Sequence, residues 1–199
     1  MADAVFSHLQ PAAARRLLLS AHDVFAAKGY HAATTREIAA GAGMSPAAMY
    51  IHYRSKQDLL FQLSLLGHEA CETVVSTALA QARGPAEQLR AMIGAFAAWH
   101  AANHTTARIV QYELTSLTRD NFEAVASIRR RIDAQISSVV ERGLATGSFE
   151  VNDLPGTALA VTSLCVDVAR WFPAANLNSP HDVAVLYGDL ALRMVGCKD

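Results

Sequence analysis

The stretch TTREIAAGAGMSPAAMYIHYRSKQDLL, residues 34–60, contains two short helical segments separated by a turn with two glycines. Thr34 or Thr35 offers an N-cap for the first segment, and the glycines that follow end it. Ser45 caps the second segment, and Pro46 takes the first helical position, where the missing proline N–H costs nothing. This spacing predicts a helix-turn-helix with a tight turn.

The apolar positions of the stretch have the spacing of a small core. Four of them are assigned to packing and excluded from any contact with a partner: Ile38, Ala42, Met49 and Tyr53. Ser55 and Asp58 form a capping-box variant that starts a long helix ending at about Gln81. The remaining side chains of the two short helices are therefore candidates for contact with a partner.

Helical periodicity continues on both sides of this stretch, and no segment predicts a strand convincingly. The clearest break in the pattern is Arg-Gly-Pro at residues 83–85, after which helical spacing resumes with Leu89, Met92 and Trp99. Further helices are expected at about residues 12–27, 105–117, 122–145, 155–172 and 181–195. We therefore predict an all-α fold of nine helices, divided into a domain at residues 1–60 and a second domain at residues 61–199.

The composition excludes several classes of protein. Lys and Arg total 17 against 18 Asp and Glu, so the overall charge identifies no partner. Hydrophobic residues make up 52% of the chain, which excludes a disordered protein and predicts extensive burial, including a subunit interface. The three cysteines, Cys71, Cys165 and Cys197, are too few and too far apart for a disulfide framework, which fits a reducing compartment. Without a secretion signal or an uncharged apolar segment of about 20 residues, a soluble, cytoplasmic protein with no membrane partner is expected.

Residues 50–60, together with Thr34-Thr35, Ile38-Ala39 and residues 42–45, closely resemble the DNA-binding domain of the TetR family of one-component repressors. The resemblance implies a nine-helix TetR-like architecture, with an N-terminal three-helix helix-turn-helix domain and a C-terminal domain for ligand binding and dimerisation. It further implies a homodimeric, ligand-responsive repressor that binds a palindromic double-stranded DNA operator and is released by a small-molecule effector. An activator or an architectural DNA-binding protein is an alternative reading of the same motif.

Nine residues form the predicted DNA-binding set: Thr35, Arg36, Ser45, Ala47, Ala48, Tyr50, Ile51, His52 and Lys56. Four carry groups that can donate to phosphate oxygens, and free amides at the starts of the two helices are expected to help them: Ser45, Tyr50, His52 and Lys56. Arg36 can reach guanine, whereas Ala47, Ala48 and Ile51 can offer only apolar contact to thymine methyl groups. Packing alone is the alternative role for Tyr50. Because residues 1–60 hold six Lys or Arg against four Asp or Glu, affinity must come from focused contacts rather than bulk charge.

The later helices carry aromatic residues interleaved with polar ones, which indicates a ligand pocket between helices. Eight residues form the predicted ligand-binding set: Phe96, Trp99, His100, Tyr112, Glu113, Asp167, Arg170 and Trp171. Ordinary core packing is the alternative for each aromatic residue. Arg170, beside Trp171 in an apolar helix, requires a partner, which is Asp167, Glu113, the dimer mate or an anionic ligand.

The C-terminal segments Ala169–Pro173 and Tyr187–Arg193 look like those of a TetR subgroup that includes repressors of sterol-ring degradation. Members of that subgroup respond to acyl-coenzyme A thioesters, so the resemblance implies a bulky apolar or acyl-CoA effector. Nine apolar residues of the last two helices are predicted to form a four-helix dimer interface, with intrachain core as the alternative: Ala158, Val161, Leu164, Cys165, Val168, Val183, Leu186, Leu190 and Met194.

Metal and catalytic sites are not predicted. His100 and His104 are four residues apart, but Ala101 stands where zinc proteases carry glutamate, and no third ligand is evident. No nucleophile elbow, P-loop or dinucleotide fingerprint is present, so we predict no cofactor and no enzyme activity. The rival hypothesis is a helical small-molecule-binding protein or enzyme that keeps a vestigial helix-turn-helix. The polar donors at Tyr50, His52 and Lys56 argue against it, because a protein that does not bind DNA has no physical need for them.

Overall fold

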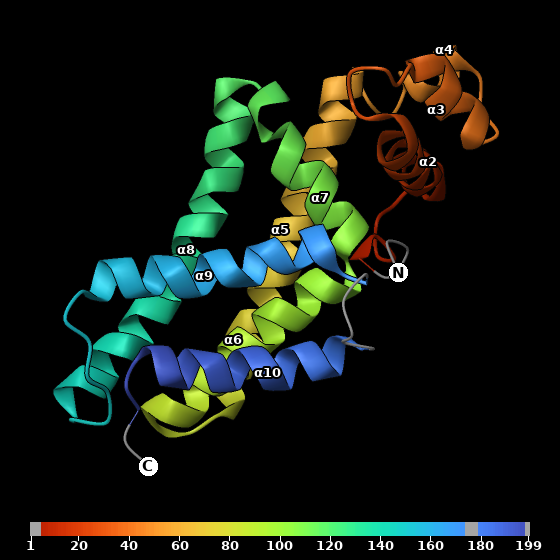
Figure 1. Cartoon of the computed structure of the whole chain (residues 1–199). Coiled ribbons are helices and arrows are strands. Elements are labelled where there is room, and N and C mark those ends of the chain that lie inside the picture. The colour runs from red at the N-terminus through yellow and green to blue at the C-terminus, as the bar shows by residue number, and fades with distance from the viewer. Residues whose placement is uncertain (1–4, 174–178, 198–199) are drawn as a thin grey trace. The chain divides into compact units, whose positions relative to one another are not determined.

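The computed structural model describes residues 5–173 and 179–197, and this part of the chain contains nine α-helices, one 3₁₀ helix and no strand (Figure 1). The predicted all-α, nine-helix fold is therefore confirmed for the described residues. None of these helices is long and apolar enough to cross a membrane. The contacts divide the chain into two compact units, and the first combines the residues up to Glu69 with Thr105–Ala126. The second combines Ala70–His104 with the residues from Ser127 onward.

The first unit begins with α2 (Ala12–Lys28), α3 (Thr35–Gly41) and α4 (Pro46–Met49). It also holds the first half of α5 (Lys56–Gln81), nearly all of α7 (His104–Glu113), the 3₁₀ helix Leu114–Ser116 and the start of α8 (Arg119–Ala145). The helix predicted at residues 105–117 thus ends at Glu113 and continues as a 3₁₀ turn, whereas the bounds of the other helices agree with the prediction within a few residues.

A small core holds α2, α3, α4 and α5 together. All four residues assigned to packing from the sequence are buried: Ile38, Ala42, Met49 and Tyr53. Leu17 and Leu18 of α2 and Leu59 and Leu60 of α5 are also fully buried. The Tyr53 hydroxyl donates to the Ala14 carbonyl at 3.1 Å, which satisfies both polar atoms inside this core. Burial raises the pKa of Tyr53 to about 12, so the phenol stays protonated and keeps donating.

The second unit is built around α6 (Gly84–Ala102), which packs most extensively on α10 (Pro180–Met194) and next on α9 (Leu154–Trp171). Two glycines permit the close approach of α6 and α10. A Cβ atom on Gly94 would lie 2.9 Å from the Ala184 carbonyl oxygen, and one on Gly188 would lie 2.9 Å from the Arg90 carbonyl oxygen. Because these neighbours are backbone atoms, any side chain at either position would force the helices apart.

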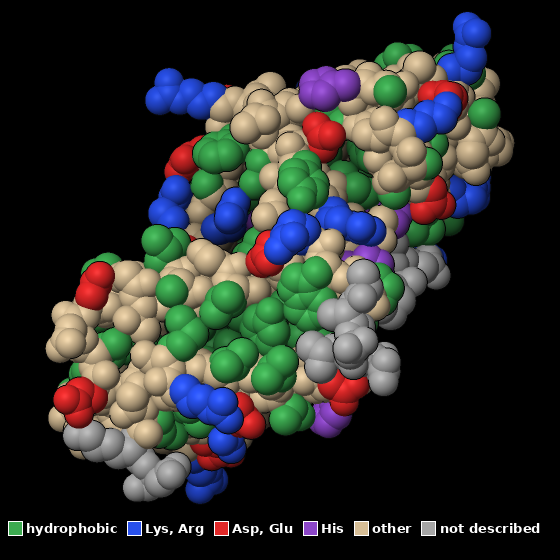
Figure 2. All heavy atoms as spheres, in the orientation of Figure 1, with side chains coloured by type: hydrophobic (Ala, Val, Ile, Leu, Met, Phe, Trp, Pro, Cys, Tyr) green, Lys and Arg blue, Asp and Glu red, His purple; other side chains and the backbone are tan. Residues whose placement is uncertain are grey.

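The apolar residues of α9 and α10 divide between the core and the surface. Five of the nine residues predicted for the dimer interface are buried within the chain, so the alternative of intrachain core holds for them: Ala158, Val161, Cys165, Val168 and Val183. Leu164 and Leu186 are exposed, as are Leu159 and Val185, which are not among the nine predicted residues. Figure 2 shows hydrophobic side chains gathered over these two helices. We call Leu159, Leu164, Val185 and Leu186 the apolar patch of α9 and α10.

Candidate nucleic-acid interface

The N-terminus of α3 is fixed by a capping box. Thr34 Oγ1 accepts from the Glu37 amide at 3.2 Å, and a Glu37 carboxylate oxygen accepts from the Thr34 amide at 3.0 Å. Thr34 is therefore the cap, which decides between the two threonines considered from the sequence. Lys28 at the end of α2 donates to the other Glu37 oxygen. The bonds from Lys28 and Thr34 lower the pKa of Glu37 to about 2, so this carboxylate is charged at neutral pH.

The turn between α3 and α4 depends on Gly43, whose φ of +69° lies in the left-handed region. Ser45 then caps α4, accepting from the Ala48 amide at 3.1 Å, and Pro46 follows at the first helical position as predicted. These caps also correct an expectation about free amides. The amides of Glu37 and Ala48 are used inside the chain and Pro46 has none, so the helix starts offer fewer donors to phosphate than expected.

The two short helices present an exposed surface that includes large apolar side chains. Five of the predicted DNA-binding residues are exposed: Arg36, Ser45, Ala47, Tyr50 and Ile51. Ile51 is 79% exposed and Tyr50 is 52% exposed. Thr35, Ala48 and His52 are half-buried. Two large apolar side chains exposed at adjacent positions, Tyr50 and Ile51, favour a surface that contacts a partner more than a single exposed residue would.

Lys56, at the first position of α5, has a different role from the one expected. Its ammonium donates to the carbonyl oxygens of Tyr30, His31 and Ala33 at 2.7, 3.2 and 2.9 Å, and lies 4.5 Å from the centre of the Tyr30 ring. An ammonium has three N–H donors, so the carbonyls of the turn between α2 and α3 account for all of them. We therefore assign Lys56 to positioning this turn, in place of the predicted phosphate contact.

A residue of α7 also contacts the turn between α2 and α3. A Glu113 carboxylate oxygen accepts from the Tyr30 amide at 3.3 Å, and the other lies 3.8 Å from His31 Nε2. Desolvation, with a smaller contribution from the Glu113 charge, raises the pKa of Tyr30. The sequence does not reveal this contact, because residues 30 and 113 are 83 positions apart and neither belongs to a local motif.

The predicted ligand residues fall into three groups. Tyr112 and Glu113 belong to the first unit, whereas the other six belong to the second. On α6, His100 makes edge contacts with Phe96 and Trp99, with ring centres 4.7 and 5.2 Å apart. At the end of α9, Trp171 stacks on Tyr187 of α10 with ring centres 6.5 Å apart, a partner that the predicted set did not include. The assembly of these groups into one pocket stays a prediction.

Arg170 pairs with Asp167, one of the partners considered from the sequence. Its Nε and Nη2 atoms donate to the two carboxylate oxygens at 2.7 and 2.9 Å, one turn earlier on α9. This bidentate pairing lowers the pKa of Asp167. Both side chains are substantially exposed, 61% for Arg170 and 44% for Asp167, so the pair does not require a ligand to balance a buried charge.

His100 and His104 are each hydrogen-bonded within the chain, with Nδ1 2.9 Å from the carbonyl oxygens of Phe96 and Ala101 respectively. Across residues 5–173 and 179–197, no group of three or more His, Cys, Asp or Glu side chains is placed to hold a metal ion. In the same part of the chain, Cys71 and Cys165 are buried free thiols, and burial raises the pKa of both.

Comparison with known families matches both regions of the chain. Residues 17–63 match the model of bacterial regulatory proteins of the tetR family, and residues 82–195 match the model of a tetracyclin repressor-like C-terminal domain. The chain belongs to the TetR family. Its helix-turn-helix of α3 and α4 lies inside the first matched region, and the packed helices α6, α9 and α10 lie inside the second. The protein is accordingly a transcriptional regulator.

Individual relatives agree with this membership. A bacterial regulatory protein of the tetR family from Rhodococcus RHA1 is 43% identical, with 96% of this chain and 100% of that chain covered and a TM-score of 0.91. The transcriptional activator FasR of Mycolicibacterium smegmatis is 26% identical over 84% of this chain and 74% of that protein. The ketosteroid transcriptional regulator KstR2 of Mycobacterium tuberculosis is 21% identical, covers 96% of this chain and 98% of its own, and has a TM-score of 0.84, which shows the shared fold.

Proposed function

We propose that this TetR-family regulator is a cytoplasmic, homodimeric repressor that binds a palindromic operator through α3 and α4 and is released by a bulky apolar or acyl-CoA effector. The observation that carries the proposal is the exposed surface around Arg36, Tyr50 and Ile51 on two helices whose ends are fixed by internal caps. Fixed helices hold these side chains ready for a major groove without an ordering cost. No catalytic role is proposed.

The roles of the contact residues follow from their chemistry. Arg36 is exposed and carries the guanidinium that reads guanine O6 and N7. Ile51 and Ala47 supply apolar contact to thymine methyl groups, while Tyr50, Ser45 and His52 donate to phosphate oxygens. The Ser45 oxygen already accepts a bond as the α4 cap, but its hydroxyl hydrogen remains able to donate outward. The half-buried Thr35 and Ala48 border this surface.

The test is operator binding at matched salt, using genomic fragments selected by the purified protein. Arg36→Ala should weaken binding to the selected operator about tenfold or more and change the preferred base at one position of each half-site. His52→Ala should weaken binding to specific and nonspecific duplexes alike. Arg119→Ala removes an exposed arginine from the start of α8 and should leave both affinities unchanged. Operator affinity that is unaltered in Arg36→Ala and His52→Ala would contradict the interface.

For the homodimer, we propose the apolar patch of α9 and α10 as the subunit interface, because monomeric proteins rarely expose several large apolar side chains together. Leu159→Lys should shift the protein towards monomers in sedimentation at micromolar concentration. Val74→Lys, at another exposed apolar position in the second unit, is the matched control and should remain dimeric. A wild-type protein that sediments as a monomer would refute the constitutive dimer.

Support for the effector class comes from the C-terminal resemblance and from the fold shared with KstR2, whose name describes a ketosteroid regulator. We propose the aromatic cluster of Phe96, Trp99 and His100, in which Phe96 and His100 are buried, as the apolar lining that such a molecule would contact. The exposed pair of Arg170 with Asp167 is not needed as an anchor. Thermal stabilisation by octanoyl-CoA, but not by free coenzyme A, would support the class, and loss of operator binding in the same titration would support repression and release.

A further inference from the structure

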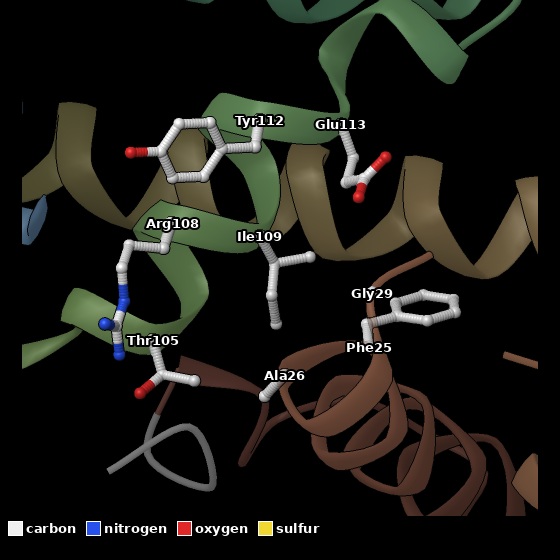
Figure 3. Close-up of a pocket in the computed structure, with 8 residues that line it drawn as sticks. All are labelled: Phe25, Ala26, Gly29, Thr105, Arg108, Ile109, Tyr112 and Glu113. Carbon is white, nitrogen blue, oxygen red and sulfur yellow. The ribbon is translucent and has the colours of Figure 1, made fainter. Parts of the chain in front are cut away.

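A groove of about 300 Å³ lies within the first unit, between the end of α2 and the outer face of α7. Phe25 and Ala26 of α2 form one wall, and Thr105, Ile109 and Tyr112 of α7 form the other. Figure 3 shows Ile109 directed from α7 towards α2, with Arg108, Tyr112 and Thr105 on one side of it and Glu113 on the other. The volume is at the lower end of the range for small-molecule sites.

The two charged side chains of the groove differ in their availability. Glu113 is already used, because its carboxylate accepts from the Tyr30 amide and lies beside His31. Arg108 is exposed, and within residues 5–173 and 179–197 it forms no ion pair or hydrogen bond. This side of the groove therefore presents an unpaired guanidinium, with the Tyr112 phenol and the Thr105 hydroxyl as further donors.

We propose that this groove binds a small amphipathic anion, with its apolar body on Ala26 and Ile109 and its carboxylate at Arg108. Guanidinium and carboxylate match in geometry and charge, and the donors beside Arg108 favour an acceptor group. Ala26 and Ile109 offer no polar atoms, so the rest of the molecule is apolar. The engaged carboxylate of Glu113 on the other side repels a second negative charge, which restricts the ligand to one anionic end.

The position of the groove connects it to the DNA-binding surface. Phe25 lines the groove and also contacts the Tyr30 ring, with ring centres 5.4 Å apart, and Lys56 holds the turn that contains Tyr30. A ligand wedged against Phe25 therefore acts on the turn that leads into α3. This consequence rests on the proposed operator binding, whereas occupancy of the groove does not, so the two are measured separately.

Occupancy is tested by calorimetric titration of the full chain, without DNA, using 1-naphthoate as the probe. We expect a dissociation constant below about 1 mM, as for other ligands of this size. Arg108→Gln removes the charge, and Ala26→Leu fills the groove from an exposed helix position; each should weaken binding about tenfold or more. The neutral analogue 1-naphthamide should bind the wild type about tenfold more weakly than 1-naphthoate.

Two matched control variants show whether the binding of 1-naphthoate depends on the groove. Ala27→Leu makes the same change at the next exposed position of α2, outside the groove, and Arg119→Gln removes another exposed arginine of the first unit. Both should bind 1-naphthoate like the wild type. No heat of binding in the wild type, or equal affinity in wild type, Ala26→Leu and Arg108→Gln, would overturn the groove as an anion site. A change in operator affinity on adding 1-naphthoate, absent in Ala26→Leu, would extend the finding to regulation.

Discussion

The helix-turn-helix and the packed helices of the second unit differ in how much they depend on hydrogen bonds and on apolar burial. In α3 and α4, helices of seven and four residues are fixed by side-chain caps, a left-handed glycine and a lysine that binds three carbonyls. In α6, α9 and α10, long helices are fixed by apolar burial and by the close approach at Gly94 and Gly188. Both regions have a buried core, and α9 and α10 are also capped, by Asp153 and Ser179. The short helices depend more on caps and hydrogen bonds because each of them buries less surface.

Gly94→Val should have the largest effect, because it places a side chain where a Cβ atom alone meets the Ala184 carbonyl oxygen. We expect the free energy of unfolding to fall by about 2–3 kcal/mol, in the range of overpacked cores. Ala134→Val puts the same side chain on an exposed position of α8 and should cost only about 0.5 kcal/mol. Urea denaturation measures both. Equal losses in the two variants would show that the close approach at Gly94 does not restrict this position to glycine.

Lys56→Met tests whether Lys56 acts on the turn or on DNA. Losing three carbonyl contacts should lower the free energy of unfolding by about 1–2 kcal/mol, since the carbonyls lose a charged donor. The slope of operator affinity against salt concentration should stay unchanged, because no phosphate contact is lost. A salt slope reduced by about one contact, with unaltered stability, would restore the phosphate role for Lys56.

Thr34→Ala and Thr35→Ala compare the cap with its neighbour. Thr34 accepts from the Glu37 amide and completes the capping box, whereas Thr35 is the first helical residue of α3. We expect Thr34→Ala to lower the free energy of unfolding by about 1 kcal/mol and Thr35→Ala by less than about 0.5 kcal/mol. Thermal unfolding of the two variants in parallel measures both losses. A larger loss of stability in Thr35→Ala would identify Thr35 as the cap.

The smallest effect concerns the pH dependence that arises from Glu37. Its pKa is lowered from 4.5 to about 2, so its contribution to stability is present above pH 4.5 and is lost as the pH falls towards 2. Glu37→Gln should therefore flatten the pH dependence of the melting temperature between pH 4.5 and 2. The matched variant Glu141→Gln, at an exposed position of α8, provides the reference curve. Identical curves for wild type and Glu37→Gln would show that the carboxylate contributes nothing to the fold.

The difference between local caps and long-range contacts explains how much of the structure could be predicted from the sequence. The caps at Thr34, Ser45 and Ser55 are local patterns, so the helices they start were predicted within a few residues. The tie between Tyr30 and Glu113 was missed because it joins distant parts of the chain. On α9, apolar residues occupy both the buried and exposed faces, so helical spacing alone did not show which face packs on α6.

Lys56 shows why a motif assigns a residue but not its role. The sequence places a cation beside the helix-turn-helix, and only the fold shows that its donors are directed at backbone carbonyls. The predicted DNA contacts at Arg36, Tyr50 and Ile51 remain predictions, although their exposure leaves them available. A residue that stabilises a turn and a residue that contacts DNA can carry the same hydrogen-bond donors. The burial of the side chain and the hydrogen bonds it already makes are needed to distinguish the two roles.

The close approach of α6 and α10 also bears on how the second unit opens in solution. With backbone lying against backbone at Gly94 and Gly188, water cannot enter between the helices by a side-chain movement alone. Amide protons near the middle of α6 and α10 should then exchange with deuterium only when both helices separate, and with a common protection factor. Amides of α3 and α4, which are short helices that bury less surface, should exchange much sooner.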